Sequence, residues 1–170
     1  MTAGGLVIEA LAAHDRANFA CGSPPLDRYL REQASQDVKR SMASCFVAFD
    51  QATGLLAGYY TLAAASFPAG DLPLDLLKRL PRYPTLPAAL IGRLAIDARH
   101  QGKGLGGALL GDAAQRVLKG DIKAFAIVVD AKDENAASFY RRHGFRPFAS
   151  RPLSLYQPLA VIKAAANPEA

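Results

Sequence analysis

The sequence predicts an α/β protein with a mixed sheet flanked by helices. Three observations support this prediction. Apolar segments with the length of strands alternate with segments of helical periodicity, turn residues separate them, and 51% of the 170 residues are hydrophobic. We expect one domain over residues 1–160 and a flexible tail over residues 161–170.

The N-terminal part supplies a strand, a helix and two further strands. Residues 6–11 form the opening strand. A helix begins at Ser23, whose side chain can cap it, and the two prolines that follow suit its first turn. Strands are expected over 44–50 and 55–67, with a turn at residues 52–54.

A segment rich in prolines interrupts this pattern at residues 68–87. Prolines at this density oppose a continuous strand or helix, so we expect a surface excursion around a short amphipathic piece, 74–80. The chain then resumes as a strand over 88–97 and enters a glycine-rich loop.

The C-terminal part alternates helices and strands. A helix with an apolar stripe begins at Leu105 and stops at Gly120. Asp133 caps a second helix, and Gly144 ends it in the left-handed conformation. The remaining strands are expected over 124–131, 145–149 and 153–160.

Composition and charge exclude several classes of protein. The net charge of +5 and the isoelectric point near 9.4 favour an acidic partner such as nucleic acid or a polyphosphate cofactor. The spacing of Cys21 and Cys45 fits neither a zinc site nor a disulfide framework. The uncharged stretch 51–70 is too interrupted for a membrane span, and no secretory signal is visible, so we expect a cytoplasmic protein that binds no membrane or metal.

The stretch "HQGKGLGG" places four glycines and Lys103 between a strand and a helix. Lys103 is followed by glycine, not by Ser or Thr, which excludes a P-loop. A dinucleotide fingerprint is matched formally, but five residues separate the strand from the first glycine, which such a site does not tolerate. The remaining pattern is Q-x-x-G-x-G over Gln101–Gly106, the glycine loop. Its amides at a helix N-terminus suit a phosphate group.

A second motif, "NAASFYRRHGF" at residues 135–145, follows the glycine loop. Together the two motifs resemble the GNAT N-acetyltransferase superfamily. The resemblance implies a mostly antiparallel sheet with splayed middle strands, acetyl-CoA as the cofactor and Tyr140 as the general acid. Asp133 stands where many members carry an asparagine that touches pantetheine, and it either contacts the cofactor or only caps the helix. The residues implied to bind acetyl-CoA are Leu94, Ala95, Ile96, Gln101, Gly102, Lys103, Gly104, Leu105, Gly106, Asp133, Ala136 and Phe139.

Further segments resemble the acetyltransferase toxins of bacterial toxin–antitoxin modules, above all "LPRYP" and "GRLAID". This resemblance implies acetylation of the α-amine of aminoacyl-tRNA, which blocks translation. It also implies a ribbon-helix-helix antitoxin and binding to operator DNA only through the antitoxin complex. We further expect a homodimer. Basic residues expected to contact tRNA phosphates are Lys39, Arg40, Lys78, Arg79, Arg82, Arg93 and Arg99.

The resemblance to the superfamily also implies a direct transfer. The amide of Leu94 or Ile96 polarises the thioester carbonyl, and Tyr140 protonates the leaving thiolate. An α-amine has a pKa of about 7.7–8.0, so water or a backbone carbonyl suffices to take its proton, and the base stays open. Two alternatives remain: transfer to a small amine, an antibiotic or a protein amine, and a binding module for acyl-CoA or tRNA without turnover.

Overall fold

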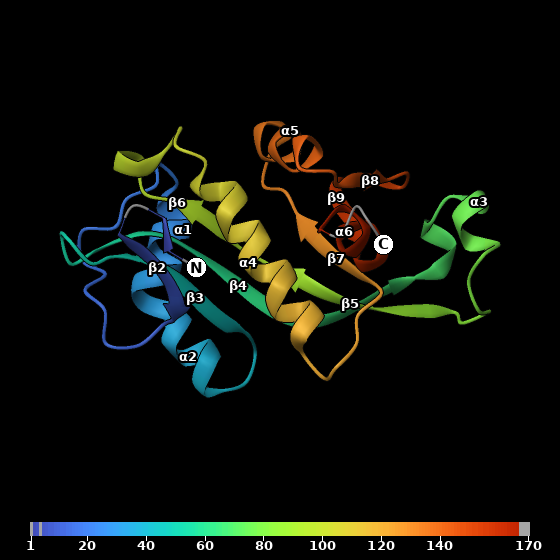
Figure 1. Ribbon diagram of the computed structural model, residues 1–170, viewed down its shortest axis with the longest axis horizontal. Coiled ribbons are helices and arrows are strands. Elements are labelled where there is room, and N and C mark those ends of the chain that lie inside the picture. Colours follow the sequence, from blue (N-terminus) through green and yellow to red (C-terminus); the bar gives the residue numbers. More distant parts are fainter. Residues whose placement is uncertain (1, 4, 167–170) are drawn as a thin grey trace. The chain divides into compact units, whose positions relative to one another are not determined.

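The computed structural model describes residues 2–3 and 5–166, and Figure 1 shows its helices and strands. The chain forms two compact units. Unit 1 comprises Met1–Ala63 and Gly92–Ala113, and unit 2 comprises Ala64–Ile91 and Ala114–Ala170. Each unit therefore takes its residues from two separate stretches of the sequence.

Unit 1 contains an antiparallel sheet. Its strands are β1 (Thr2–Ala3), β2 (Leu6–Ala10), β3 (Ser44–Asp50), the first part of β4 (Leu55–Pro68) and β6 (Leu94–Ile96). β3 lies between β2 and β4, and β6 pairs with the opposite edge of β4. The β3–β4 turn is tight, since Gly54 has a φ of +73° and its N–H donates to the Asp50 carbonyl oxygen at 2.8 Å.

One helical run packs against β3. It consists of α1 (Pro24–Arg28), a π-helical turn over Tyr29–Gln33 and α2 (Ala34–Lys39). Both prolines lie in the first turn, where an amide hydrogen has no helical partner. Ser23 occupies the N-cap position as predicted, although within the described residues its side chain makes no capping hydrogen bond. The π-helical turn inserts one extra residue into the helix, which the α-helical period of 3.6 residues does not predict.

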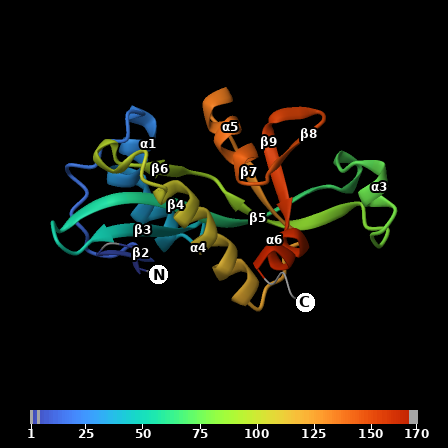
Figure 2. The ribbon, with the colours of Figure 1, turned by 45° about the horizontal axis from the view of Figure 1, so that its top comes forward.

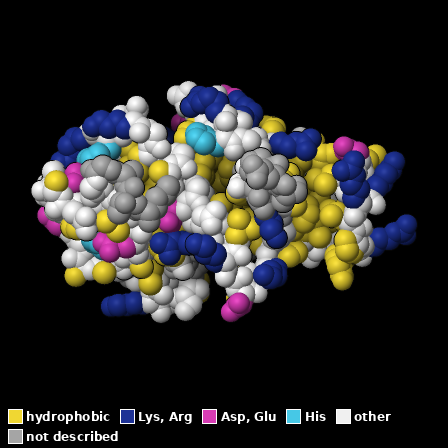
Figure 3. All heavy atoms as spheres, viewed as in Figure 1, with side chains coloured by type: hydrophobic (Ala, Val, Ile, Leu, Met, Phe, Trp, Pro, Cys, Tyr) yellow, Lys and Arg dark blue, Asp and Glu magenta, His cyan; other side chains and the backbone are white. Residues whose placement is uncertain are grey.

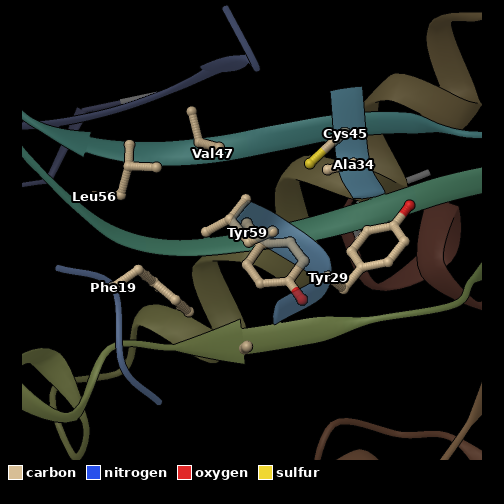
Figure 4. Close-up of a cluster of buried hydrophobic side chains, with 9 residues drawn as sticks. Phe19, Tyr29, Ala34, Cys45, Val47, Leu56 and Tyr59 are labelled. Carbon is tan, nitrogen blue, oxygen red and sulfur yellow. The ribbon is translucent and has the colours of Figure 1, made fainter. Parts of the chain in front are cut away.

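The helical run and the sheet enclose the core of unit 1 (Figure 4). The rings of Tyr29 and Tyr59 stack with 6.3 Å between their centroids, and Phe19 meets Tyr59 edge-on at 5.6 Å. Smaller side chains fill the space around these rings: Leu30, Ala34, Cys45, Val47, Leu56 and Ala95. The Tyr59 hydroxyl donates to the Leu26 carbonyl oxygen at 2.7 Å, which ties α1 to β4.

Unit 2 contains a mixed sheet and most of the remaining helices. Its further strands are β5 (Thr85–Ile91), β7 (Ala126–Asp130), β8 (Arg146–Phe148) and β9 (Arg151–Pro158). β5 and β7 are parallel, whereas β9 is antiparallel to both β7 and β8. Its helices are η2 (Ala69–Asp71), α3 (Leu74–Leu77), α5 (Glu134–Arg142) and α6 (Leu159–Ala166). α5 packs against β8 and β9, and α6 packs against β7 and β9 (Figure 2).

Apolar side chains from the strands form the core of unit 2. Phe148 and Tyr156 stack with their centroids 4.7 Å apart, and Phe67 meets Phe148 at 5.3 Å. Helix α4 (Leu105–Lys119) belongs to both units. It begins in unit 1, after a 3₁₀ turn at Ala98–His100, and continues into unit 2. Its start and end agree with the prediction from the sequence.

The structure corrects three expectations. The strand expected over 88–97 is two strands, β5 and β6, with a break at Gly92 and Arg93. β5 also begins earlier, at Thr85, so that the last residues of the proline-rich segment are strand. Residues 159–166 form helix α6, although a strand end and a tail were expected there; residues 167–170 lie outside the described part.

The uncharged stretch 51–70 is mostly the strand β4, as expected. Among the helices of residues 5–166, none combines the length and the apolar character that a membrane span requires.

Two glycines are expected to respond to alanine with opposite signs. Gly144 has a φ of +90°, and a Cβ there would stand 2.5 Å from Nε2 of Gln157. Gly144→Ala should therefore lower the free energy of unfolding by about 1–3 kcal/mol. Gly111 lies inside α4 with open space at its Cβ position, so Gly111→Ala should raise it by about 0.5–1 kcal/mol. Urea unfolding of both variants checks this, and equal effects would contradict it.

Candidate functional site

The break between β5 and β6 is fixed by a threonine from β4. The Thr61 N–H donates to the Arg93 carbonyl oxygen at 3.0 Å, and the Thr61 hydroxyl accepts from the Arg93 N–H at 3.1 Å. A Cβ on Gly92 would stand 3.3 Å from the Thr61 hydroxyl oxygen. Thr61 is 2% exposed, so its hydroxyl hydrogen-bonds to the backbone at the strand break and not to solvent.

Strand β6 directs two of its amides away from β4. Arg93 is bonded to β4, and hydrogen-bonded pairs alternate along an antiparallel ladder, so Ala95 is the next residue bonded to β4, opposite Tyr59. Leu94 and Ile96 therefore point their N–H groups to the opposite side. An extended strand edge of this kind can pair with an amide or a carbonyl of a ligand.

The glycine loop follows β6 and is anchored to it. The side-chain amide of Gln101 donates to the carbonyl oxygens of Ile96 and Cys21, each at 2.9 Å. Gly102 and Gly104 have φ values of +77° and +81°, and the positions of their absent Cβ atoms face open space. Left-handed residues in a turn gather their amides into a concave anion-binding surface, to which the first turn of α4 adds its own N–H groups.

A cavity of about 430 Å³ adjoins the glycine loop. It is lined by Leu6, Asp50, His100, Lys103, Gly104, Leu105 and Ala108. Lys103 supplies a positive charge, and Nε2 of His100 lies 3.8 Å from the Asp50 carboxylate. The open amides, the lysine and the cavity fit the phosphate-bearing part of a nucleotide cofactor.

A buried carboxylate, Asp97, follows β6 and caps the 3₁₀ turn Ala98–His100 that leads into the glycine loop. Asp97 is 1% exposed and accepts hydrogen bonds from the Arg99 guanidinium at 2.8 and 3.0 Å and from the amides of Arg99 and Ala20 at 2.9 and 3.1 Å. Burial alone raises the pKa of this carboxyl, but the four donors outweigh burial and lower the pKa to about 2. Asp97 therefore stays ionised and holds the start of the loop.

The guanidinium of Arg93 rests on an aromatic ring. Its central carbon lies 3.7 Å from the centroid of the Tyr29 ring, a cation–π contact. The Tyr29 hydroxyl donates to Oδ2 of Asp37 at 2.7 Å, and Nε2 of Gln33 donates to Oδ1 at 3.0 Å. Burial and the bond to Asp37 raise the pKa of Tyr29. Arg93 is thus held through both its backbone and its side chain.

Tyr140 lies in unit 2, on α5. It is 6% exposed, and its ring meets those of Phe139 and Phe145 edge-on at 5.2 and 5.6 Å. Burial, and then the charge of Asp130, raise the pKa of Tyr140 to about 12. Asp133 caps α5 by accepting from the Ala136 N–H at 2.9 Å, so capping is one role that the structure gives to this carboxylate.

The structure divides the predicted site residues between the two units. Unit 1 holds the β6 residues, the glycine loop, Lys39, Arg40, Arg93 and Arg99, and unit 2 holds Tyr140, Asp133, Ala136, Phe139, Lys78, Arg79 and Arg82. Arg99 forms an ion pair with Asp97. Lys78, Arg79 and Arg82 follow α3 in the sequence.

Three residues that shape the site, Thr61, Tyr29 and Asp37, were not predicted from the sequence. Thr61 stands in a mostly apolar strand next to Tyr59 and Tyr60, so its hydroxyl is only a weak signal for a buried polar contact. Nothing local in the sequence links the other two to Arg93.

Comparison with known proteins decides the family. A family model for the acetyltransferase (GNAT) domain matches residues 41–147. The chain belongs to the GNAT acetyltransferase family. A tRNA-acetylating toxin of Mycobacterium tuberculosis is 35% identical over 84% of this chain and 85% of its own length. A probable toxin TacT of Sinorhizobium fredii is 29% identical over 88% of each chain. The family predicted from the sequence is confirmed.

Solved GNAT toxins share this fold. A tyrosine-to-phenylalanine mutant of KacT is 29% identical with a TM-score of 0.88, over 95% of this chain and 99% of its own. AtaT complexed with acetyl-methionyl-tRNA is 27% identical with a TM-score of 0.86, over 95% and 99%. Mutant AtaT bound to the C-terminus of the antitoxin AtaR and to acetyl-CoA is 25% identical with a TM-score of 0.82, over 96% and 99%. The expected fold, a mostly antiparallel mixed sheet with flanking helices, and the expected cofactor, acetyl-CoA, are confirmed.

Replacing Asp97 should weaken the fold of unit 1. Asp97→Asn removes the negative charge that pairs with Arg99. It also places the amide NH₂ of asparagine, a hydrogen-bond donor, against N–H groups that need an acceptor, so the free energy of unfolding should fall by about 2–4 kcal/mol. Asp121→Asn, at an exposed aspartate, should change it by less than about 0.5 kcal/mol. Urea unfolding measures both.

The same carboxylate predicts a pH dependence. The folded pKa is about 2 and the unfolded pKa is about 3.9, so Asp97 stabilises the fold above pH 4 and loses this contribution as the pH falls toward 2. The Asn variant should lack that part of the acid-induced loss. If the free energy of unfolding fell with pH by the same amount in the wild type and in the Asn variant, the assignment would be wrong.

Proposed function

We propose that this GNAT acetyltransferase is a toxin that transfers the acetyl group of acetyl-CoA to the α-amine of an aminoacyl-tRNA and thereby blocks translation. The observation that carries the proposal is the glycine loop, whose two left-handed glycines open an anion-binding surface a few residues after β6, the strand whose Leu94 and Ile96 amides point away from β4. The tRNA-acetylating relatives, which match over most of the chain, support the choice of substrate.

In this proposal the glycine loop, Lys103 and the N-terminus of α4 bind the cofactor's pyrophosphate. Gln101 acts by holding the loop against β6, through its two bonds to carbonyl oxygens. Leu94 and Ile96 offer their outward N–H groups to the pantetheine arm. Ala95 bonds to β4 through its backbone, and its side chain packs in the core of unit 1, so its proposed contribution is to hold β6 in place for the arm. In unit 2, Ala136, Phe139 and Asp133 are the further contacts proposed for the arm.

Bound acetyl-CoA supplies an activated acetyl group as a thioester. The N–H of Leu94 or Ile96 polarises the thioester carbonyl, as an oxyanion-hole donor does. Tyr140 donates its phenolic proton to the departing sulfur. The raised pKa, about 12, keeps this phenol protonated near neutral pH, so its proton is available for transfer. The substrate α-amine is substantially neutral near pH 8, and water or a backbone carbonyl takes its proton.

The tRNA is bound by positive charge in this proposal. Lys39 and Arg40 lie at the exposed end of α2, and Arg93 stands beside β6 with its guanidinium fixed over Tyr29. A fixed guanidinium loses little freedom when it meets a phosphate. Lys78, Arg79 and Arg82 extend the positive charge in unit 2, and Arg99 contributes the face of its guanidinium that Asp97 leaves exposed.

A ribbon-helix-helix antitoxin is the proposed protein partner, and the toxin reaches operator DNA only within the antitoxin complex. The binding of an antitoxin C-terminus by AtaT supports the first part. We also propose that the protein is a homodimer.

The decisive experiment mixes the purified protein with acetyl-CoA and aminoacyl-tRNAs and detects N-acetylated aminoacyl-tRNA by mass spectrometry. Tyr140→Phe should reduce kcat by about 10²–10⁴-fold, because general acid catalysis contributes that much, while the Kd for acetyl-CoA stays within twofold. Expression of the wild type should arrest growth, and expression of the variant should not. Acetylation of small amines alone, with tRNA untouched, would refute the proposed substrate.

The salt dependence of tRNA binding tests the proposed surface. Replacing Lys39, Arg40 and Arg93 by glutamine removes three positive charges, so log Kd against log salt should flatten by about two to three units of slope. Gln replacement of Lys119 and Lys123, two exposed lysines that are not among the proposed tRNA contacts, should leave the slope unchanged. Filter binding with deacylated tRNA gives both slopes.

A further inference from the structure

The segment between η2 and β5 contains a groove whose lining includes two of the proposed tRNA contacts, Lys78 and Arg82. It lies wholly in unit 2, within the arm formed by Pro68–Pro84, and its volume is about 690 Å³. It is lined by Ala69, Gly70, Leu74, Leu77, Lys78, Leu80, Pro81, Arg82, Tyr83 and Pro84.

The arm is held in shape before any partner binds. The Ala69 N–H donates to the Pro84 carbonyl oxygen at 3.0 Å, which closes the base of the arm. Leu72, buried in the core of unit 2, anchors its middle. Four prolines fix φ along the arm, namely Pro68, Pro73, Pro81 and Pro84. Because folding has already ordered the arm, a partner that binds there loses little free energy to ordering the arm.

The arm exposes large apolar side chains. Leu76 and Leu77 of α3 pack against the core of unit 2, whereas Leu74 of the same helix is 73% exposed and Tyr83 is 63% exposed. Figure 3 shows hydrophobic side chains gathered on this part of unit 2, with Lys and Arg side chains at their edge. Exposed apolar groups beside a groove mark an interaction site, and tyrosine and arginine are favoured in protein interfaces.

The charge of the groove selects the kind of partner. Among its lining residues the charged ones, Lys78 and Arg82, are both positive. Of the arm's aspartates, Asp71 is paired with Arg151 at 3.1 Å, and Asp75 lies outside the lining. Cations at the rim of an aliphatic floor suit a chain that carries carboxylates beside leucine-like side chains. RNA offers phosphates but no aliphatic groups for Leu74, Leu77 and Leu80.

We propose that this groove binds an acidic amphipathic segment of a protein partner, with apolar anchors in the groove and carboxylates on Lys78 and Arg82. The inference rests on the proposed function, in which that partner is the antitoxin. It changes the role of Lys78 and Arg82 from tRNA contacts to partner contacts.

The test uses the full-length protein and a fluorescent helical peptide of about 18 residues, with leucines at i, i+3, i+4 and i+7 and glutamates elsewhere. A matched peptide carries lysine in place of glutamate. Fluorescence anisotropy should show binding of the acidic peptide only. Leu74→Glu should weaken it at least tenfold while acetylation of aminoacyl-tRNA continues unchanged, and circular dichroism should show an intact fold.

Charge reversal tests whether the acidic peptide binds at this groove or at any positively charged surface of the protein. The variant Lys78→Glu with Arg82→Glu should lose the acidic peptide and gain the lysine peptide. Lys119→Glu with Lys123→Glu, which makes the same change of charge elsewhere in unit 2, should bind the acidic peptide like the wild type. Equal binding by all variants, or no binding by the wild type, would overturn the proposal.

RNA as the occupant is a further outcome that would overturn it. In that case the Lys78 and Arg82 reversal would lower the affinity for deacylated tRNA, and Leu74→Glu would leave peptide binding intact. Because peptide binding requires neither acetyl-CoA nor aminoacyl-tRNA, a wild type that binds the peptide without acetylating tRNA would refute only the proposed function.

Discussion

The candidate site of unit 1 depends on how the chain accommodates one buried charge, the carboxylate of Asp97. An ionised group without partners is expensive to bury, so its position forces donors to converge on it. Arg99 supplies three of them, and Ala20, from a distant part of the sequence, supplies the fourth. Their convergence fixes where β6 stops, and the glycine loop starts from that fixed point.

Much of the fold follows from local patterns. Apolar runs of strand length predict β3 at its observed bounds, and an apolar stripe ending in glycine predicts α4. Gly144 takes the left-handed conformation that its place after a helix requires. The glycine loop was equally visible, because a phosphate-binding turn needs several glycines within a few residues.

What the sequence did not predict depends on contacts between distant residues. The strand break at Gly92 is made by Thr61, more than thirty positions earlier, and no local propensity encodes it. Arg93 was singled out as a charge in an apolar strand, but its support on Tyr29 exists only after the helical run packs against the sheet. The motif assigns Gln101 to the cofactor, and it does not predict that the Gln101 side chain also holds the loop through the carbonyl oxygens of Cys21 and Ile96. Helix α6 was missed because its first residues, Leu159 and Ala160, fit equally well as the end of the preceding strand.

The two interleaved units have a consequence for handling the gene. Strand β4 begins in unit 1 and ends in unit 2, and α4 does the same. A chain truncated at either crossing would leave half of a strand or half of a helix without the neighbours it was shaped to meet. Messages cut short, and deletion libraries in general, should therefore yield no partial enzyme, and activity should appear only with the intact reading frame.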